Sequence, residues 1–486
     1  MIKHQIRQED FIMKKVRSFK GKIVAVKRVK KNNVIGTLDV CTLFRKYFIP
    51  TLFGMLSISA VTAVDGILVG HGIGSDGIAA INICIPLLML FTGIGLMAGV
   101  GSSVIASIQL SKGKLGAARL NVTQALLFVT IAAIVPSALM MAYPSATARF
   151  LGASEHLTPM VREYLLWFIP SLIFQMWCSV CLFMIRLDGA PKLAMMCNII
   201  AAIITVILGW LFIFPLGWGL TGAAFAATIA LFASGATGLI YLWKFAHKLR
   251  LYPIKWSIRS FRFSLLNIVC QCRIGSSALL TEAILATLMF VGNHTLMKYL
   301  GDNGVGAFGI ACYYLPFVFM VGNAIAQSAQ PIISYNFGLG EKKRVADTKR
   351  IALFTSVVCG IVTTAAFILF PHILVGLFVN PDSTAALIAI EGFPYFSLAF
   401  VFFIINLMLI GYYQSVENVK LANLFALLRG FVFLIPCFIL LPEAMGTNGA
   451  WLALCLSEML TILTVAVLFI LRKKKTLLHQ TGEECS

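Results

Sequence analysis

The sequence predicts an all-α integral membrane protein with 12 transmembrane helices, arranged as two parallel six-helix lobes around a central cavity. Three observations lead to this fold class. The 486 residues are 59% hydrophobic and 12% charged, with a mean hydropathy of +0.91, whereas soluble domains contain about 25% charged residues. Apolar runs long enough to cross a bilayer occur twelve times. The second six of these runs also repeat features of the first six.

The predicted spans follow from the length that a helix needs to cross the hydrocarbon core. A core of about 30 Å takes about 20 apolar residues in an α-helix. Runs of that length, bounded by Gly, Pro or charged residues, lie at 47–70, 78–109, 120–143, 160–186, 192–214, 219–243, 268–297, 305–336, 350–378, 389–414, 420–441 and 447–471. They divide the chain into an N-terminal arm (1–46), an N-lobe (47–243), a linker (244–267), a C-lobe (268–471) and a C-terminal tail (472–486).

The positive charges indicate how the chain is oriented. The net charge is +20, and 35 of the 39 Lys and Arg residues fall in the two tails, in the loops on their side of the membrane or at the adjoining span ends. Arg149, Arg162 and Lys298 fall on the opposite side, and Arg429 lies within a span. Cytoplasmic segments are rich in Lys and Arg. We therefore expect both termini, the arm, the linker and the tail to be cytoplasmic.

The two lobes are predicted from an internal repeat. When the chain is shifted by 227 residues, IGSDGIAAINI (Ile73–Ile83) aligns with LGDNGVGAFGI (Leu300–Ile310). PKLA at Pro191–Ala194 likewise falls near VKLA at Val419–Ala422. Six spans separate the equivalent segments, an even number, so both halves have the same orientation. Parallel repeats of this kind are an architecture of secondary transporters.

Composition and motifs argue against several other classes of function. The basic residues cluster beside the first and last spans, which is typical of a topology signal, so we expect no nucleic acid partner. No GxxxxGK[ST] nucleotide-binding loop occurs, so transport should draw on an ion gradient. The 12 cysteines and seven histidines show no spacing typical of a metal or catalytic site. We therefore expect no enzyme, no catalytic residue, no metal and no cofactor apart from H⁺ or Na⁺ as coupling ion.

Several motifs, in chain order, carry a resemblance to a known family. They are VDGILVG (Val64–Gly70), RLDGAPKLAM (Arg186–Met195), LLTEAILATLMFVGN (Leu279–Asn293), QPIISYNFGLGEKKR (Gln330–Arg344) and GYYQSVENVKLA (Gly411–Ala422). In content and position they resemble motifs of the bacterial type of the MATE family, the multidrug and toxic compound extrusion transporters. The resemblance covers the whole chain. It implies an ion-coupled antiporter that exports organic cations or drugs by alternating access.

Three acidic residues fall clearly within spans, away from the span ends: Asp65, Glu282 and Glu458. A charged side chain at the middle of the bilayer costs roughly 2.5–3.5 kcal/mol, so each of these residues is expected to have a functional or structural role that offsets the cost. The resemblance implies that Glu282, on the seventh span, is the ion-coupling residue, and that Asp65 is a second one. The fifth span has Thr205 and Gly209 where related proteins often show an Asn and an Asp. Because of this departure, the sequence does not decide whether Asp65 forms an ion site. The departure also favours H⁺ over Na⁺ as the coupling ion.

For Glu458 we expect a hydrogen bond that packs helices together, with Arg429 as its partner. Other polar side chains within spans should face the central cavity or neighbouring helices, because they are costly in lipid. The substrate-cavity residues predicted on this basis are Asn293, Tyr313, Gln327, Gln330 and Asn336.

The cargo is less well determined than the fold. A lipid-linked saccharide flippase of the same superfamily is an alternative, but it should need cationic side chains in the cavity to hold pyrophosphate. Arg429 is the only Lys or Arg that the predicted spans place deep in the membrane, so the electrostatics favour an organic cation. A membrane enzyme or a receptor is a more distant alternative. The expected partners are the small-molecule cation and membrane lipid, and we expect a monomer.

Overall fold

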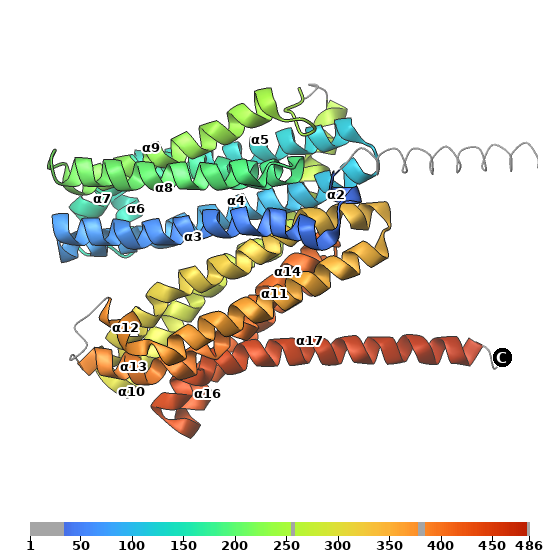
Figure 1. Ribbon diagram of the computed structural model, residues 1–486. Coiled ribbons are helices and arrows are strands. Elements are labelled where there is room, and N and C mark those ends of the chain that lie inside the picture. Colours follow the sequence, from blue (N-terminus) through green and yellow to red (C-terminus); the bar gives the residue numbers. More distant parts are fainter. Residues whose placement is uncertain (1–33, 254–257, 378–383, 484–486) are drawn as a thin grey trace, which may run out of the picture.

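The computed structural model describes residues 34–253, 258–377 and 384–483, and within these ranges the chain is built from helices and short connections, without a β-strand. Two bundles of helices lie side by side (Figure 1). One contains α3 to α9 and is called the N-lobe, and the other contains α10 to α17 and is called the C-lobe. Most of the N-terminal arm lies outside the described residues.

The N-lobe begins after the single turn of α2 (Val34–Thr37). Its helices are α3 (Val40–Gly72), α4 (Ser75–Ser111), α5 (Leu115–Ala142), α6 (Pro144–Phe150), α7 (Thr158–Asp188), α8 (Pro191–Ile213) and α9 (Gly219–Ile240), followed by the π-helical segment η1 (Tyr241–Phe245). The helices of the C-lobe are α10 (Ile258–Leu339), α11 (Lys342–Leu369), α12 (Pro371–Gly376), α13 (Thr384–Ser397), α14 (Ala399–Ser415), α15 (Val419–Leu427), the π-helical segment η2 (Leu428–Val432), α16 (Leu434–Met445) and α17 (Thr447–Glu483).

The membrane spans agree with the predicted number. Eleven helices of the described residues are long and apolar enough to cross a membrane, and the pair α13 and α14, bent by 47°, makes a twelfth if it is counted as one span. Each overlaps one predicted run, although several begin earlier or end later. The first span starts at Val40 instead of residue 47, and the seventh helix starts at Ile258 within the predicted linker. The C-terminal tail continues α17 as far as Glu483.

The internal repeat is visible in the backbone. Gly74, the N-cap of α4, has φ 94° and ψ −167°. Gly301, its predicted equivalent, has φ 62° and ψ −153°, and it breaks α10 into the seventh and eighth spans. Positive φ with an extended ψ is accessible to glycine and costly for residues with a Cβ atom. The same rare conformation at both positions supports the alignment of the two halves.

The lobes touch each other in the half of the molecule that carries the described ends of the chain and spread apart toward the opposite end (Figure 1). Helices α4 and α10 cross with their backbones in contact. A Cβ atom on Gly101 would lie 1.9 Å from the carbonyl oxygen of Gln271, and one on Gly275 would lie 1.9 Å from that of Met97. Small residues permit such an approach between membrane helices. The structure is therefore closed between the lobes at the end of the termini.

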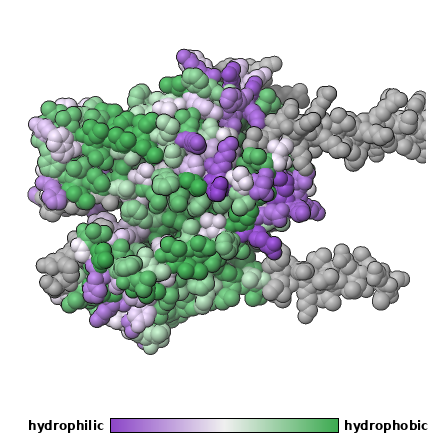
Figure 2. Space-filling view, in the orientation of Figure 1, coloured by the Kyte–Doolittle hydropathy of each residue, from purple (hydrophilic) through white to green (hydrophobic). Residues whose placement is uncertain are grey.

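The surface has the polarity expected of a membrane protein. Figure 2 shows apolar side chains over the middle of both lobes and hydrophilic side chains toward the two ends. The hydrophilic side chains are most abundant at the end from which the two chain termini emerge (Figure 2). This distribution agrees with helices that cross a bilayer along the long direction of the bundles.

Candidate transport site

A cavity of about 220 Å³ lies inside the molecule, lined by α3, α4, α7, α8, α9 and α10. Most of its wall belongs to the N-lobe, and Glu282, Met320, Asn323 and Gln327 reach it from α10 of the C-lobe. A smaller cavity of about 40 Å³ shares Glu282, Asn323 and Gln327 with it. Helices from both lobes therefore build one polar region near the middle of the membrane spans, where secondary transporters bind their cargo.

Glu282 is the acidic residue of this region. It lies near the middle of the seventh span, 9% exposed, and it lines both cavities. Among the residues that the structure describes, none donates a hydrogen bond to its carboxylate or forms an ion pair with it. A buried charge without a partner is unfavourable. The carboxyl group is therefore free to bind a proton, a metal cation or a positively charged group that enters the cavity.

Two other predicted cavity residues lie beside Glu282. Gln327 lines both cavities and accepts a hydrogen bond at 2.5 Å from Nη1 of Arg186 on α7. Gln330 lines the smaller cavity, and its Nε2 donates to the carbonyl oxygen of Val100 on α4 at 3.3 Å. Both amides thus bridge the C-lobe and the N-lobe. They contribute to the cavity wall and to the closure between the lobes.

Three predicted residues are not brought to this region. Tyr313 is 57% exposed and Asn293 is also exposed, and neither lines the two cavities. Asn336 is fully buried at the end of the eighth span. Its Nδ2 donates to the carbonyl oxygen of Ile332 at 2.8 Å, and its Oδ1 accepts from Nε of Arg344 at 3.0 Å. The structure places Asn336 where it secures a helix end, away from the cavity.

Asp65 stands apart from Glu282. It lies half-buried on α3 and lines neither cavity. Its Oδ1 is buried without a hydrogen-bond partner in the described part of the chain. Thr205, the fifth-span residue discussed with it above, lines the larger cavity instead, as does Asn198 of the same helix. The structure thus shows an unpaired carboxylate oxygen at Asp65 but separates it from the polar region around Glu282.

Arg186 is the residue that sequence reasoning missed. It had been counted with the loop between the fourth and fifth spans, but it lies in the last turn of α7, 2% exposed, and lines the larger cavity. Arg186 is therefore a second buried cation in addition to Arg429, although it lies at the end of its span. No signal in the sequence indicated this, because the place of Arg186 in the cavity wall depends on the direction of its side chain, whose guanidinium lies 5.5 Å from the centre of the Phe183 ring, one turn earlier in α7.

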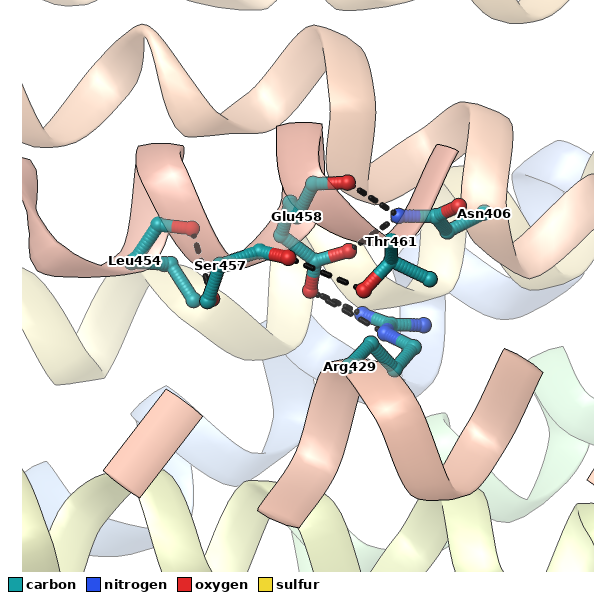
Figure 3. A network of polar contacts seen from close by, with 6 residues as sticks. All are labelled: Asn406, Arg429, Leu454, Ser457, Glu458 and Thr461. Carbon is teal, nitrogen blue, oxygen red and sulfur yellow. Dashed lines mark hydrogen bonds and ion pairs between the residues drawn. The ribbon is translucent and has the colours of Figure 1, made fainter. Parts of the chain in front are cut away.

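The remaining buried charges form an ion pair, as predicted. Nη2 of Arg429 lies 2.7 Å from Oε1 of Glu458, and Nε donates to the same oxygen at 3.0 Å. Nδ2 of Asn406 on α14 donates to Oε2 of Glu458 at 2.6 Å (Figure 3). The Arg429 guanidinium also lies 4.4 Å from the centre of the Phe403 ring. This network joins α14, η2 and α17 and is confirmed as a packing interaction.

Asp188, two residues after Arg186, has a structural role. Its carboxylate accepts hydrogen bonds from the backbone N–H groups of His247, Lys248 and Leu249 at 2.9, 2.8 and 3.1 Å. The Tyr241 hydroxyl donates to it at 2.8 Å. The carboxylate thereby fixes the start of the linker to the end of α7. Within the described residues, no group of three metal-ligating side chains is assembled.

The sequence is similar to a family of known membrane transporters. The MatE family model matches residues 50–211 and again residues 278–439, one match in each lobe. A FAD transporter of Shewanella oneidensis is 26% identical over 317 residues, which cover 63% of this chain and 67% of that protein. A probable multidrug resistance protein NorM of Mesorhizobium japonicum is 22% identical over 434 residues, 86% of this chain and 91% of that protein.

Solved structures share the fold. One, described as the outward-facing conformation of a multidrug resistance MATE family transporter of the MOP superfamily, has a TM-score of 0.83 at 18% identity, covering 90% of this chain and 96% of that one. Another, a MOP superfamily transporter from Pyrococcus furiosus described as having a binding pocket of reverse polarity, has a TM-score of 0.81 at 18% identity with the same coverage. These structures confirm the predicted fold class. With a match in each lobe, the chain belongs to the MatE family of membrane transporters.

Proposed function

We propose that this MatE transporter is an ion-coupled antiporter that exports small organic cations by alternating access, with Glu282 as the coupling residue. The observation that carries the proposal is the carboxyl group of Glu282, buried in a cavity between the lobes without a protein partner. Such a group can hold either a proton or a cationic cargo, and competition between the two is the requirement for antiport.

The cycle follows from this competition. In a state open to the outside, Glu282 takes up a proton, which removes the negative charge that holds the cation. The lobes then rock so that the cavity faces the cytoplasm, where loss of the proton restores the carboxylate for the next cation. A proton with equal affinity for both states would shift nothing, so its binding must differ between them. For the cavity to face the cytoplasm, the backbone contact between α4 and α10 at Gly101 and Gly275 has to separate.

The orientation and the ion are parts of the same proposal. The abundance of Lys and Arg on the side of the termini supports cytoplasmic termini. The similarity to transporters of Shewanella oneidensis and Mesorhizobium japonicum supports a location in the inner membrane of a bacterium. The fifth span, with Thr205 and Gly209 where related proteins often show an Asn and an Asp, supports H⁺ over Na⁺. Asp65, with its unpaired oxygen, is the second candidate for ion coupling.

A second class of cargo is favoured by Arg186, whose positive charge lines the same cavity. One relative is described as a FAD transporter, and FAD carries negatively charged phosphates. The lipid-linked saccharide flippase considered above would also need a cationic group in the cavity, so Arg186 keeps that alternative open. A single guanidinium opposite a single carboxylate nevertheless fits a cargo with a positive group better than a pyrophosphate.

Uptake of a fluorescent organic cation into proteoliposomes tests the proposal. Wild-type protein should concentrate the dye under an imposed pH gradient, and Glu282→Gln should reduce this uptake at least about tenfold, since it removes both the charge and the titration. Glu391→Gln, which changes an exposed glutamate of α13, is the matched control and should behave as wild type. Undiminished uptake by Glu282→Gln would mean that the coupling residue lies elsewhere. Uptake driven by a Na⁺ gradient alone would mean that Na⁺, and not H⁺, is the coupling ion.

A further inference from the structure

Arg186 carries more hydrogen-bonding capacity than the protein uses. A guanidinium has five N–H donors, and the structure gives Arg186 one hydrogen bond, from Nη1 to the side-chain oxygen of Gln327. Its Nε is buried and has no partner in the described part of the chain. The other contact is with the ring of Phe183, whose centre lies 5.5 Å from the guanidinium carbon.

Arg186 has no compensating negative charge in the described part of the chain. Among the described residues, no carboxylate lies within ion-pair distance of it. Asp188 is the acidic residue closest to it in sequence, but its oxygens are occupied by the linker N–H groups and by Tyr241. The polar groups that share the cavity wall are neutral apart from Glu282. A buried guanidinium without an anion is unfavourable unless a ligand supplies one.

The fold does not require a cation at this position. Aligning PKLA (Pro191–Ala194) with VKLA (Val419–Ala422) puts Gln414 of the C-lobe at the position of Arg186. Gln414 lines the smaller cavity, and its Nε2 donates to Oγ of Ser277 at 2.8 Å. A neutral amide therefore satisfies the structure in one lobe. The charge in the other lobe is an addition that faces the cavity.

We propose that Arg186 binds an anionic group of the cargo, a carboxylate or a phosphate, so that the preferred cargo carries both a positive and a negative group. The inference rests on the proposed function, because it takes the cavity as the cargo site and Glu282 as the partner of the positive group. An anion would form charge-assisted hydrogen bonds with the N–H groups that the protein leaves free, and a guanidinium can bind carboxylate or phosphate in a bidentate manner.

A matched pair of dyes tests this inference. The probes are a rhodamine with a free carboxylate, a zwitterion, and the methyl ester of the same dye, a cation. Binding is measured by fluorescence anisotropy on the purified full-length protein in detergent, without any ion gradient. Wild type should bind the zwitterion about tenfold more tightly than the ester, which corresponds to about 1.4 kcal/mol. Arg186→Gln should abolish this preference, because it should weaken binding of the zwitterion and leave binding of the ester unchanged. Arg186→Lys should retain part of the preference.

Two controls separate the possible outcomes. Glu282→Gln should weaken both dyes, because both carry the positive charge, so loss of ester binding in this variant reports on the proposed function and not on Arg186. Gln327→Leu removes the amide that Arg186 contacts and changes part of the cavity wall, so it should weaken binding of both dyes by a similar factor and keep the tenfold ratio between their affinities. Equal binding of the two dyes to wild type, or an equal loss of both in Arg186→Gln, would overturn the inference. So would a Gln327→Leu variant that behaves like Arg186→Gln, because Arg186 would then serve only as a contact between the lobes.

Discussion

Two pairs of buried charges in this transporter have opposite surroundings. Arg429 and Glu458 are joined by two hydrogen bonds, supported by Asn406 and by the ring of Phe403 (Figure 3). Arg186 and Glu282 line one cavity and are not paired with each other or with another charge of the described residues. The difference shows that burial alone does not distinguish a functional charged residue from a structural one, because all four residues are buried. The distinguishing feature is a buried charge whose partners are missing and which faces open space.

The largest effect is expected where the paired charges are separated. Arg429→Met leaves Glu458 buried without its partner, which should destabilise the protein by about 3–5 kcal/mol. The double variant Arg429→Met, Glu458→Met should recover most of this loss, because an apolar pair of similar size needs no compensating charge. Melting temperatures of the detergent-solubilised variants provide the measurement. A single variant as stable as wild type would contradict a packing role for the pair.

A smaller effect is expected at Asp188, which is satisfied by hydrogen bonds and not by an ion pair. Asp188→Ala removes the acceptor for three backbone N–H groups and for Tyr241. Leaving several donors without an acceptor should cost about 1–3 kcal/mol. Hydrogen exchange at His247, Lys248 and Leu249 should accelerate in this variant. If exchange there is unchanged, Asp188 does not hold the linker.

The unpaired charges should be dispensable for stability. Glu282→Gln and Arg186→Gln replace buried charges that have no protein partner of opposite sign with neutral amides that can still form hydrogen bonds, so each should leave the free energy of unfolding within about 0.5 kcal/mol of wild type or raise it. The same melting assay used for Arg429 measures this. Destabilisation of either variant to the extent seen in Arg429→Met would mean that the two pairs do not differ as described.

The smallest effect is expected at the exposed start of α3. The hydrogen bond from the backbone N–H of Thr42, together with that of Cys41, holds the pKa of Asp39 below its ordinary value. Because the pKa is lowered in the folded protein, the stabilisation is complete above the ordinary pKa and is lost as the pH falls below about 4. Protection of the Cys41 and Thr42 amides against hydrogen exchange, relative to their intrinsic exchange rates, should decrease in that range, and Asp39→Ala should show the lower protection already at neutral pH. Equal protection in both proteins would contradict this cap.

Much of the fold could be predicted from the sequence because its signals are local. Each predicted span corresponds to an apolar helix or to the bent pair, since length and hydropathy suffice to define a span. Gly74 and Gly301 marked the repeat because the turn at both positions demands a residue without a Cβ atom. Positive charge defined the linker and the tails, but it did not show where helices begin and end. Helix α17 therefore continues through residues predicted as tail.

The site was harder to predict, because the spans are apolar on all sides and lack the periodicity that distinguishes one face of a helix from another. Glu282 and Gln327 were found because a polar group within a span is rare. The same reasoning also selected Tyr313 and Asn293, which the structure places on exposed faces. Arg186 was assigned to a loop because it lies at a span boundary. Only the direction of its side chain shows that it belongs to the cavity.

Proton release on cargo binding tests the central claim most directly, because exchange of a proton for a cation at one carboxyl group is the basis of the proposed antiport. The purified protein in weakly buffered detergent solution, near the pH at which Glu282 is protonated in part of the molecules, is mixed with the rhodamine methyl ester while a pH-sensitive dye records free protons. Wild type should release protons as the cation binds, and Glu458→Gln, if it remains folded, should do the same. Glu282→Gln should release none. Release of equal size from Glu282→Gln and wild type would contradict the account.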